Sequence, residues 1–181
     1  PFYKVGDMNT KGNEVEMHLS NNYVSNELAT SKKWGTAPAG TVIFPKIGAA
    51  IATNKKRILT EPSLFDNNVM GIICGDRILP KFMLYLLNSI DISQWASLSN
   101  PPSISMDAVL KQQIPLPPLD VQRQIVRELD GYQQVIAGAK MALSNYLPTI
   151  SCSSGSKKAL EDIAIFKPAK DEVKSMPGET D

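Results

Sequence analysis

A run of basic side chains without acidic neighbours is the part of this sequence best suited to binding a ligand. No Asp or Glu occurs from Leu28 to Thr60. The same stretch carries six positive charges, at Lys32, Lys33, Lys46, Lys55, Lys56 and Arg57. On a chain whose net charge is only +1, a local field of one sign suits a polyanion, and nucleic acid is the commonest polyanion. The alternative is a solvated lysine face whose acidic partners come from elsewhere in the fold.

These basic residues are suited to different parts of a DNA duplex. Phosphate contacts supply much of the affinity, whereas base edges supply the specificity. We predict phosphate contacts at Lys32, Lys33, Lys55, Lys56 and Arg57. Arg57 is also suited to reading guanine through two parallel donors, which a lysine does with poorer geometry.

Neighbouring residues add candidates of other kinds. Lys46 stands close to Gly48, where the missing side chain lets the backbone approach a duplex. Asn54 is suited to pairing with adenine. The alternative for Lys46 is a charge at the end of a strand, and for Asn54 it is a turn residue.

Two polar loops offer further donors. The loop 7–13 carries Lys11 among short polar side chains near a glycine, and a plain β-turn explains it almost as well. The loop 97–105 contains two consecutive prolines and carries Ser99 and Asn100. Stiff loops on a scaffold often hold recognition groups, so we include both residues among the DNA-binding candidates.

The sequence offers no motif for catalysis or for a metal. It contains no glycine-rich phosphate loop, no H-E-x-x-H zinc motif and no nucleophile elbow. His18, Cys74 and Cys152 are too few to hold a metal, and we interpret both cysteines as free thiols in a reducing cytoplasm. The apolar runs fall well short of the roughly 20 residues that cross a bilayer, so no membrane span is predicted.

The elements that must position these residues indicate an α+β fold. Residues 1–115 contain short β-like runs at 41–44 and 69–74 and helical patches at 81–88 and 106–111, divided by Gly, Pro and Asn. Short strands mixed with short helices in one segment are typical of this class.

A long helix is predicted over residues 119–147. Its apolar residues recur in alternating steps of four and three, which is the heptad pattern of a left-handed coiled coil. The seven positions of this helix-pairing seam are Ile125, Leu129, Tyr132, Ile136, Ala139, Leu143 and Tyr146. Asp120 is placed to cap the first turn and Pro148 to stop the helix.

Three prolines just before this helix, Pro115, Pro117 and Pro118, predict a rigid, extended exit from the globular part. A helix of this length spans about 43 Å, which is longer than a domain of this size is expected to cover, so the seam favours a partner helix. The alternative is a single long helix that packs on its own domain.

The proline-rich entry and the helix carry a resemblance to a known family. The stretch IPLPPLDVQRQIVRELD, residues 114–130, resembles the start of a conserved helical region in the specificity (S) subunits of type I restriction-modification systems. Three upstream blocks resemble successive parts of the family's target recognition domain: PFYKVGDMN at 1–9, GTVIFPKIGAAIATNKKRIL at 40–59 and ILPKFMLYLLNS at 78–89. The likeness covers nearly the whole chain in the right order.

The resemblance implies a protein without catalytic chemistry of its own. S subunits read a two-part DNA sequence, each half through one recognition domain, while two conserved helices pack antiparallel as a ruler. They dock methyltransferase (M) subunits, and a restriction (R) subunit can join; S-adenosylmethionine and ATP belong to those partners. For this chain the resemblance implies half of such a subunit, which binds double-stranded DNA and forms a homodimer through its long helix.

The resemblance also implies the domain organisation. Residues 1–115 form the main part of a target recognition domain, 116–150 the helical region, and 151–181 a linker with a further segment. That segment, LEDIAIFKPAKDEVKSMPGETD at 160–181, resembles the opening of a recognition domain, which in the family usually precedes the PFYKVGDMN block. Either the chain is cut so that it ends in the start of a second domain, or it is circularly permuted and its tail completes the first. We favour the permutation, because domain termini often lie close together.

Two other functions stay open at this point. The chain is alternatively the recognition portion of a fused methyltransferase-endonuclease, whose catalytic motifs would lie outside it. It is alternatively a coiled-coil adaptor without DNA binding, which would have no salt-dependent affinity for a duplex to lose.

Overall fold

The structure is a computed structural model that describes residues 1–146. The predicted helix stop at Pro148, the thiol of Cys152 and the segment 151–181 therefore lie outside the described residues. The chain divides into two compact units, and residues 1–139 form the first. The fold described below is that of this first unit.

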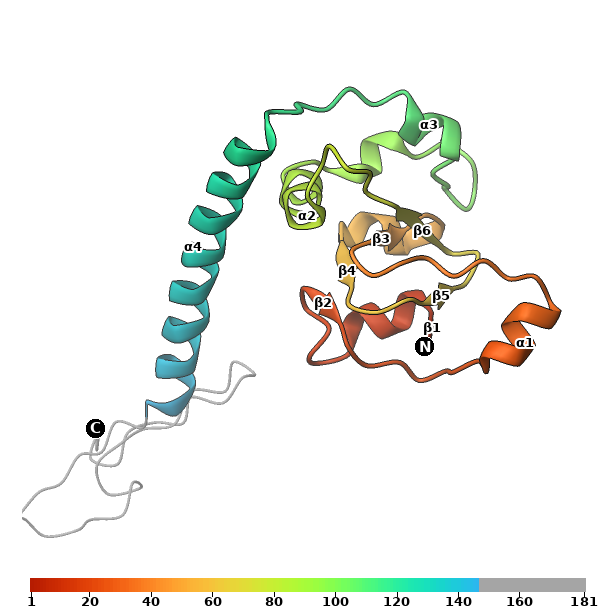
Figure 1. Cartoon of the computed structure of the whole chain (residues 1–181), viewed down its shortest axis with the longest axis horizontal. Coiled ribbons are helices and arrows are strands. Elements are labelled where there is room, and N and C mark those ends of the chain that lie inside the picture. Colours follow the sequence, from red (N-terminus) through yellow and green to blue (C-terminus); the bar gives the residue numbers. More distant parts are fainter. Residues whose placement is uncertain (147–181) are drawn as a thin grey trace, which may run out of the picture. The chain divides into compact units, whose positions relative to one another are not determined.

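A four-stranded sheet forms the centre of the unit (Figure 1). Its strands lie in the order β2 (Glu16–Met17), β4 (Arg57–Leu59), β3 (Val42–Pro45) and β6 (Val69–Ile72). β3 pairs antiparallel with β4 and with β6, whereas β2 pairs parallel with β4. All four residues of β3 are buried, as expected of a central strand that is covered on both faces.

The two faces of β3 support separate parts of the core. Val42 packs with Met83, Leu84 and Leu87 of α2 (Pro80–Asn88), whereas Ile43 belongs to a second cluster that contains Tyr3. This division follows from the alternation of side chains along a strand. Pro80 stands at the start of α2, where its missing N–H costs nothing.

Short elements connect and cover these layers. β1 (Phe2–Tyr3) pairs parallel with β5 (Leu64–Phe65) in a separate two-stranded sheet. The short helices are η1 (Val5–Asn9), α1 (Asn26–Ser31), η2 (Gly48–Thr53), η3 (Ile92–Trp95) and α3 (Met106–Leu110). The predicted mixture of α and β elements is confirmed.

The predicted long helix is present as α4 (Leu119–Asn145) and follows the proline-rich exit. Asp120 lies within the first turn and pairs with Arg123 at 2.6 Å, on the helix surface. Among residues 1–146, no helix is long and apolar enough to cross a membrane.

Candidate nucleic-acid interface

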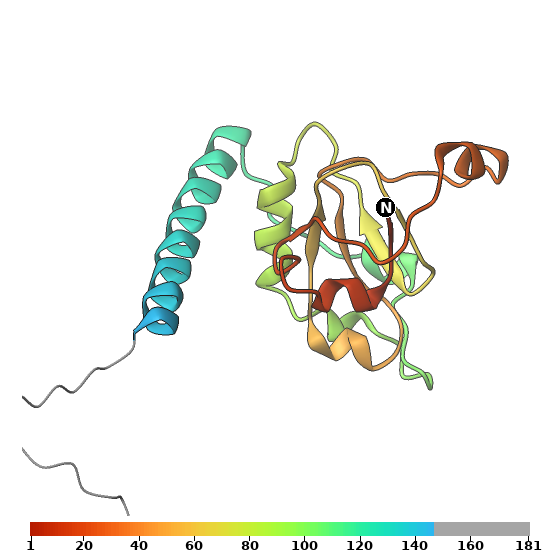
Figure 2. The same ribbon diagram turned by 90° about the horizontal axis from the view of Figure 1, so that it is seen from below.

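Segments that carry predicted DNA-binding residues meet at one end of the first unit. The side chain of Lys55 donates a hydrogen bond to the side chain of Asn9, which brings the turn after η2 next to η1. Figure 2 shows η1, η2 and the loop after η3 on the same lower side of the molecule. Lys11 is exposed in the loop that directly follows η1.

The loop 97–103 joins this end through backbone contacts. Ile47 forms a β-bridge with Ser103, and the Gly48 N–H donates to the Pro102 carbonyl at 2.8 Å. The Ile104 N–H donates to the Lys46 carbonyl, also at 2.8 Å. Lys46 and Gly48 are therefore held beside the loop that carries Ser99 and Asn100, both of which are exposed.

We call this set of segments the recognition end. It consists of Asn9–Lys11, Lys46–Gly48, Lys55 and Ser97–Ser103. Its lysines, Lys11, Lys46 and Lys55, belong to segments that the fold links through these bonds; Lys11 is exposed, and Lys46 and Lys55 are half-buried. Two acidic residues carry the opposite charge: Asp91 is exposed after α2, and Glu14 is exposed after the loop that carries Lys11.

The loop that presents Lys11 is held by two buried polar side chains. The Asn13 amide nitrogen donates to the carbonyls of Asp7 and Leu19 at 2.8 and 2.7 Å, and its oxygen accepts from the His18 and Leu19 N–H groups at 2.9 and 3.0 Å. Asp7 Oδ2 accepts from the Lys4 N–H at 2.8 Å. The sequence indicated only a turn here, because residue type alone does not show that an Asn is buried and fully bonded.

Lys56 is buried, with 2% of its surface exposed, and we correct its predicted role. Its Nζ donates to Asn54 Oδ1 at 2.6 Å and to the Ile90 carbonyl at 2.7 Å. Burial lowers the pKa of Lys56 to about 8. A side chain enclosed in this way does not reach a phosphate, so Lys56 supports the fold instead.

Asn54 is likewise occupied inside the fold. It ends η2 in the left-handed conformation, with φ of 52°, which Asn tolerates better than most residues. Its oxygen accepts from the Ile92 N–H at 3.0 Å as well as from Lys56, and its nitrogen donates to the Ile90 carbonyl at 3.3 Å. The predicted pairing with adenine is therefore corrected to the alternative, a turn residue.

Arg57 ties β4 to η1 and is not free to read guanine as predicted. Its two terminal nitrogens donate to the backbone carbonyls of Lys56 and Met8, at 2.8 and 3.1 Å. Its Nε is buried and has no hydrogen-bond partner among residues 1–146, and burial lowers the pKa of the guanidinium. The fork that pairs with a base edge is thus taken up by the protein itself.

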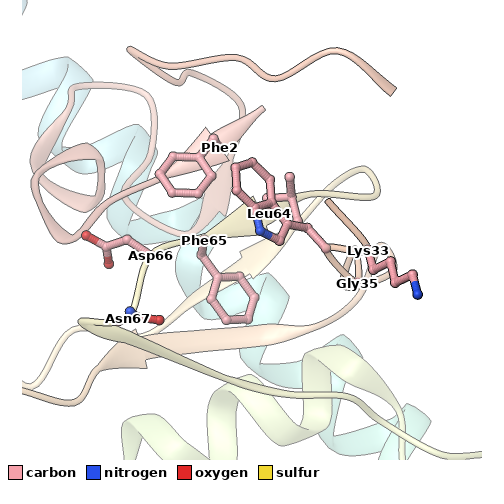
Figure 3. A pocket seen from close by; sticks show the side chains of 8 residues that line it. Phe2, Lys33, Gly35, Leu64, Phe65, Asp66 and Asn67 are labelled. Atoms are coloured by element: carbon pink, nitrogen blue, oxygen red, sulfur yellow. The ribbon is translucent and has the colours of Figure 1, made fainter. Parts of the chain in front are cut away.

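Lys32 and Lys33, which we call the α1 lysines, lie apart from the recognition end. Both are exposed just after α1, and Figure 2 places α1 on the upper side, away from η1 and η2. Lys33 lies at the edge of a cavity of about 470 Å³ whose lining includes Phe2 and Phe65 (Figure 3). Its side chain points away from these rings.

The helix-pairing seam divides into a covered part and an uncovered part. Ile125 and Leu129 are half-buried. The later seam residues Tyr132, Ile136, Ala139, Leu143 and Tyr146 are exposed, although most of them are large and apolar. Val135 and Met141 add exposed apolar surface that the heptad pattern did not include. A stripe of this kind is typical of a helix that pairs with another element.

Comparisons with known proteins give one family match and two similar solved structures. The sequence model of the family described as "Type I restriction modification DNA specificity domain" matches residues 1–146. A chain from a structural study of complex assembly and conformational transition of the type I R-M system is 20% identical with a TM-score of 0.60, over 80% of this chain and 33% of that chain. The HsdS subunit from Thermoanaerobacter tengcongensis is 20% identical with a TM-score of 0.54, over 78% of this chain and 32% of that one.

Because the sequence identity is only 20%, these two likenesses establish the fold alone. The described chain spans about a third of the length of either solved chain. A comparison with curated protein sequences gives no match.

Proposed function

We propose that this chain, which belongs to the family of type I restriction modification DNA specificity domains, recognises one half of a two-part DNA target for a type I system. The family that the sequence predicted is thereby confirmed. The observation that carries the proposal is the recognition end, where the Lys55 side chain bonds Asn9, two residues before Lys11, and the Lys46 carbonyl bonds the end of the loop 97–103. Loops that are held by a scaffold and carry positive charge suit a phosphate backbone.

Division of labour among these residues follows from their surroundings. We assign the phosphate contacts, which position a protein on the duplex, to the three lysines. We assign base-edge contacts to Asn100, which is exposed on the adjoining loop, and to Ser99, whose hydroxyl would have to leave the Pro101 carbonyl that it bonds at 2.9 Å. The α1 lysines stay a proposal as a second, separate phosphate contact.

The remaining functions in this proposal belong to partners. The chain itself carries out no catalysis, S-adenosylmethionine and ATP are bound by the M and R subunits, and the chain docks M subunits. Since its partners are these subunits and cellular DNA, we place its action in the cytoplasm. The division at residues 115 and 150 into recognition domain and helical region also stays a proposal.

The exposed apolar part of α4 supports pairing with a second copy. Two chains related by a two-fold axis would bury each other's seam from Tyr132 onward and place two recognition ends at a fixed separation.

A selection from random DNA duplexes with the purified full chain tests the function. Selected with and without the M subunit, the chain is expected to enrich a two-part motif with a single spacer length. A coiled-coil adaptor would enrich nothing and show no loss of duplex affinity with salt, whereas DNA binding predicts log K falling by about 0.9 per phosphate contact against log salt. Absence of any enriched motif in both selections contradicts the proposal.

A further inference from the structure

The joint between α4 and the rest of the first unit contains two polar contacts that the DNA-binding proposal does not use. The first is Gln122, in the first turns of α4, whose side chain is fully buried. Its oxygen accepts from the Leu79 N–H at 2.9 Å, and its nitrogen donates to the carbonyls of Arg77 and Pro117 at 2.9 and 2.8 Å. One carboxamide thus joins three places: the loop before α2, the start of α2 and the proline-rich exit.

The second contact is made by Asp130, eight residues further along the helix. Its two oxygens accept from different residues of α2: Oδ1 from the Tyr85 hydroxyl at 2.6 Å and Oδ2 from Lys81 Nζ at 3.0 Å. Lys81 and Tyr85 lie one turn apart on the same face of α2. Partial burial favours a higher pKa for Asp130, but the hydrogen bonds from Tyr85 and Lys81 outweigh it and lower the pKa, so the carboxylate is charged at neutral pH.

The covered part of α4 ends at this second contact. Between the two anchors, Ile125, Val126 and Leu129 are half-buried, whereas every described residue from Gly131 onward is exposed. The anchors are separated by about 12 Å along the helix axis. Two contacts that far apart fix both the direction of a helix and its rotation, whereas either one alone leaves a pivot.

We infer that Gln122 and Asp130 are positioning residues that set the length of spacer DNA which the protein accepts between its two half-sites. This inference rests on the proposed function, since it requires two recognition domains carried by paired helices. Adding one base pair to a spacer moves the half-sites apart by about 3.4 Å and turns them by roughly 35°. A stiff joint rejects that change, and a loosened joint swivels to accommodate it.

The test compares spacer preference in full-length variants. Gln122→Ala and Asp130→Ala, singly and together, are matched by Gln124→Ala and Glu128→Ala, which remove exposed side chains from the same helix. Random-duplex selection with each protein is expected to return the same half-site sequences throughout. The preference for the best spacer over one that is a base pair longer or shorter should fall about threefold to tenfold in each anchor variant, the equivalent of one lost hydrogen bond, and stay unchanged in the controls.

A second measurement is independent of DNA. Spin labels on cysteines introduced at Ala52 and Arg127, in a background without Cys74 and Cys152, report the distance between η2 and α4 in the free protein. The distribution is expected to be narrow in the parent and in the controls and broad in the anchor variants. Asp130→Ala serves if Gln122→Ala does not fold, because Asp130 is only half-buried.

The outcomes separate the two proposals. A broadened distance together with a broadened spacer preference supports the inference. An unchanged spacer preference in folded anchor variants overturns it, whatever the distances show. If the parent protein enriches no two-part motif although the anchor variants broaden the distance, the proposed function is contradicted and the spacer role falls with it, while the mechanical joint is retained.

Discussion

Lys55 and Lys56 are neighbours in sequence but have different surroundings. Replacing them one at a time distinguishes a phosphate contact from a charge that supports the fold. The Lys55 side chain lies at the surface with Asn9, whereas Lys56 is enclosed. Lys55→Ala and Lys56→Met both remove one positive charge from the same turn. Any effect of overall charge is therefore common to the two variants, and their difference reports position alone.

The expected size of the Lys55 effect follows from counterion release. Loss of one phosphate contact lowers the slope of log K against log salt by about 0.9, which amounts to about fivefold weaker binding in 0.15 M salt. Lys56→Met is expected to keep the parent slope. Fluorescence anisotropy with one labelled 30-base-pair duplex, titrated from low to high salt, measures both quantities.

Lys56→Met should instead change how stability depends on pH. The pKa of Lys56 is about 8 in the folded chain and near the ordinary 10.5 when unfolded, so between these values the unfolded chain binds more protons. Stability from this group therefore rises with pH across that window. From pH 7.5 to 9.5 the parent should gain about 2 kcal/mol of unfolding free energy relative to Lys56→Met.

Urea unfolding at the two pH values measures this difference. The tyrosines titrate in the same way in both proteins, so their effect on the unfolding free energy cancels in the comparison. The carbonyl of Ile90 keeps Asn54 as a donor, so the Met variant is expected to fold. Equal loss of salt slope in the two variants would refute the reasoning, because it would mean that the enclosed Lys56 contacts DNA as well as the half-buried Lys55 does.

Three further predictions concern other parts of the molecule. Lys11→Ala should lower the salt slope by about 0.9, and replacing both α1 lysines should lower it by up to about twice that amount, because they are proposed as a second phosphate contact; an unchanged slope in the second case would exclude α1 from the footprint. Ile136→Asp with Leu143→Asp should convert dimers into monomers in sedimentation while the single chain stays folded, because both residues are exposed in it, and persistent dimers would contradict the pairing seam. Asn13→Ala should lower the unfolding free energy by about 2 to 4 kcal/mol in urea unfolding, since four buried hydrogen bonds are lost, whereas Asn26→Ala on α1 should cost far less; similar losses would deny Asn13 its role in holding the loop.

The long elements of this fold were accessible from the sequence and the shortest ones were not. The heptad steps predicted α4 within two residues of its observed end, and the runs at 41–44 and 69–74 correspond to β3 and β6. β1, β2 and β5 have two residues each, and an alternation cannot be recognised over two positions. Their pairing depends on contacts between distant segments, such as Phe2 with Leu64, which no local pattern contains.

The same limit applied to the candidate site. The sequence predicts one basic surface because the charges of the block are close in sequence. The fold instead separates the α1 lysines from Lys55 and brings Lys55 to the segment that carries Lys11. Gln122 and Asp130 could be seen as members of a helix, but their bonding depends on the loop before α2 and on α2 itself. Position along a helix does not show which polar side chain will be covered.

One part of the error could have been avoided, because the apolar pattern of β4 indicates which of the neighbouring charges enter the protein. Ile58 and Leu59 are consecutive apolar residues in β4, and they enter the core on opposite faces of the sheet. Both faces of this strand are therefore buried, and alternation carries the two preceding residues to the same two sides: Lys56 toward the Ile90 carbonyl and Arg57 toward η1. Of the three basic residues, only Lys55 lies before the segment 56–59, which is covered on both sides. In this chain the basic run that leads into a doubly buried strand thus places its last two charges inside the protein, and Lys55, nearest the turn, is the one whose bond to Asn9 lies at the surface.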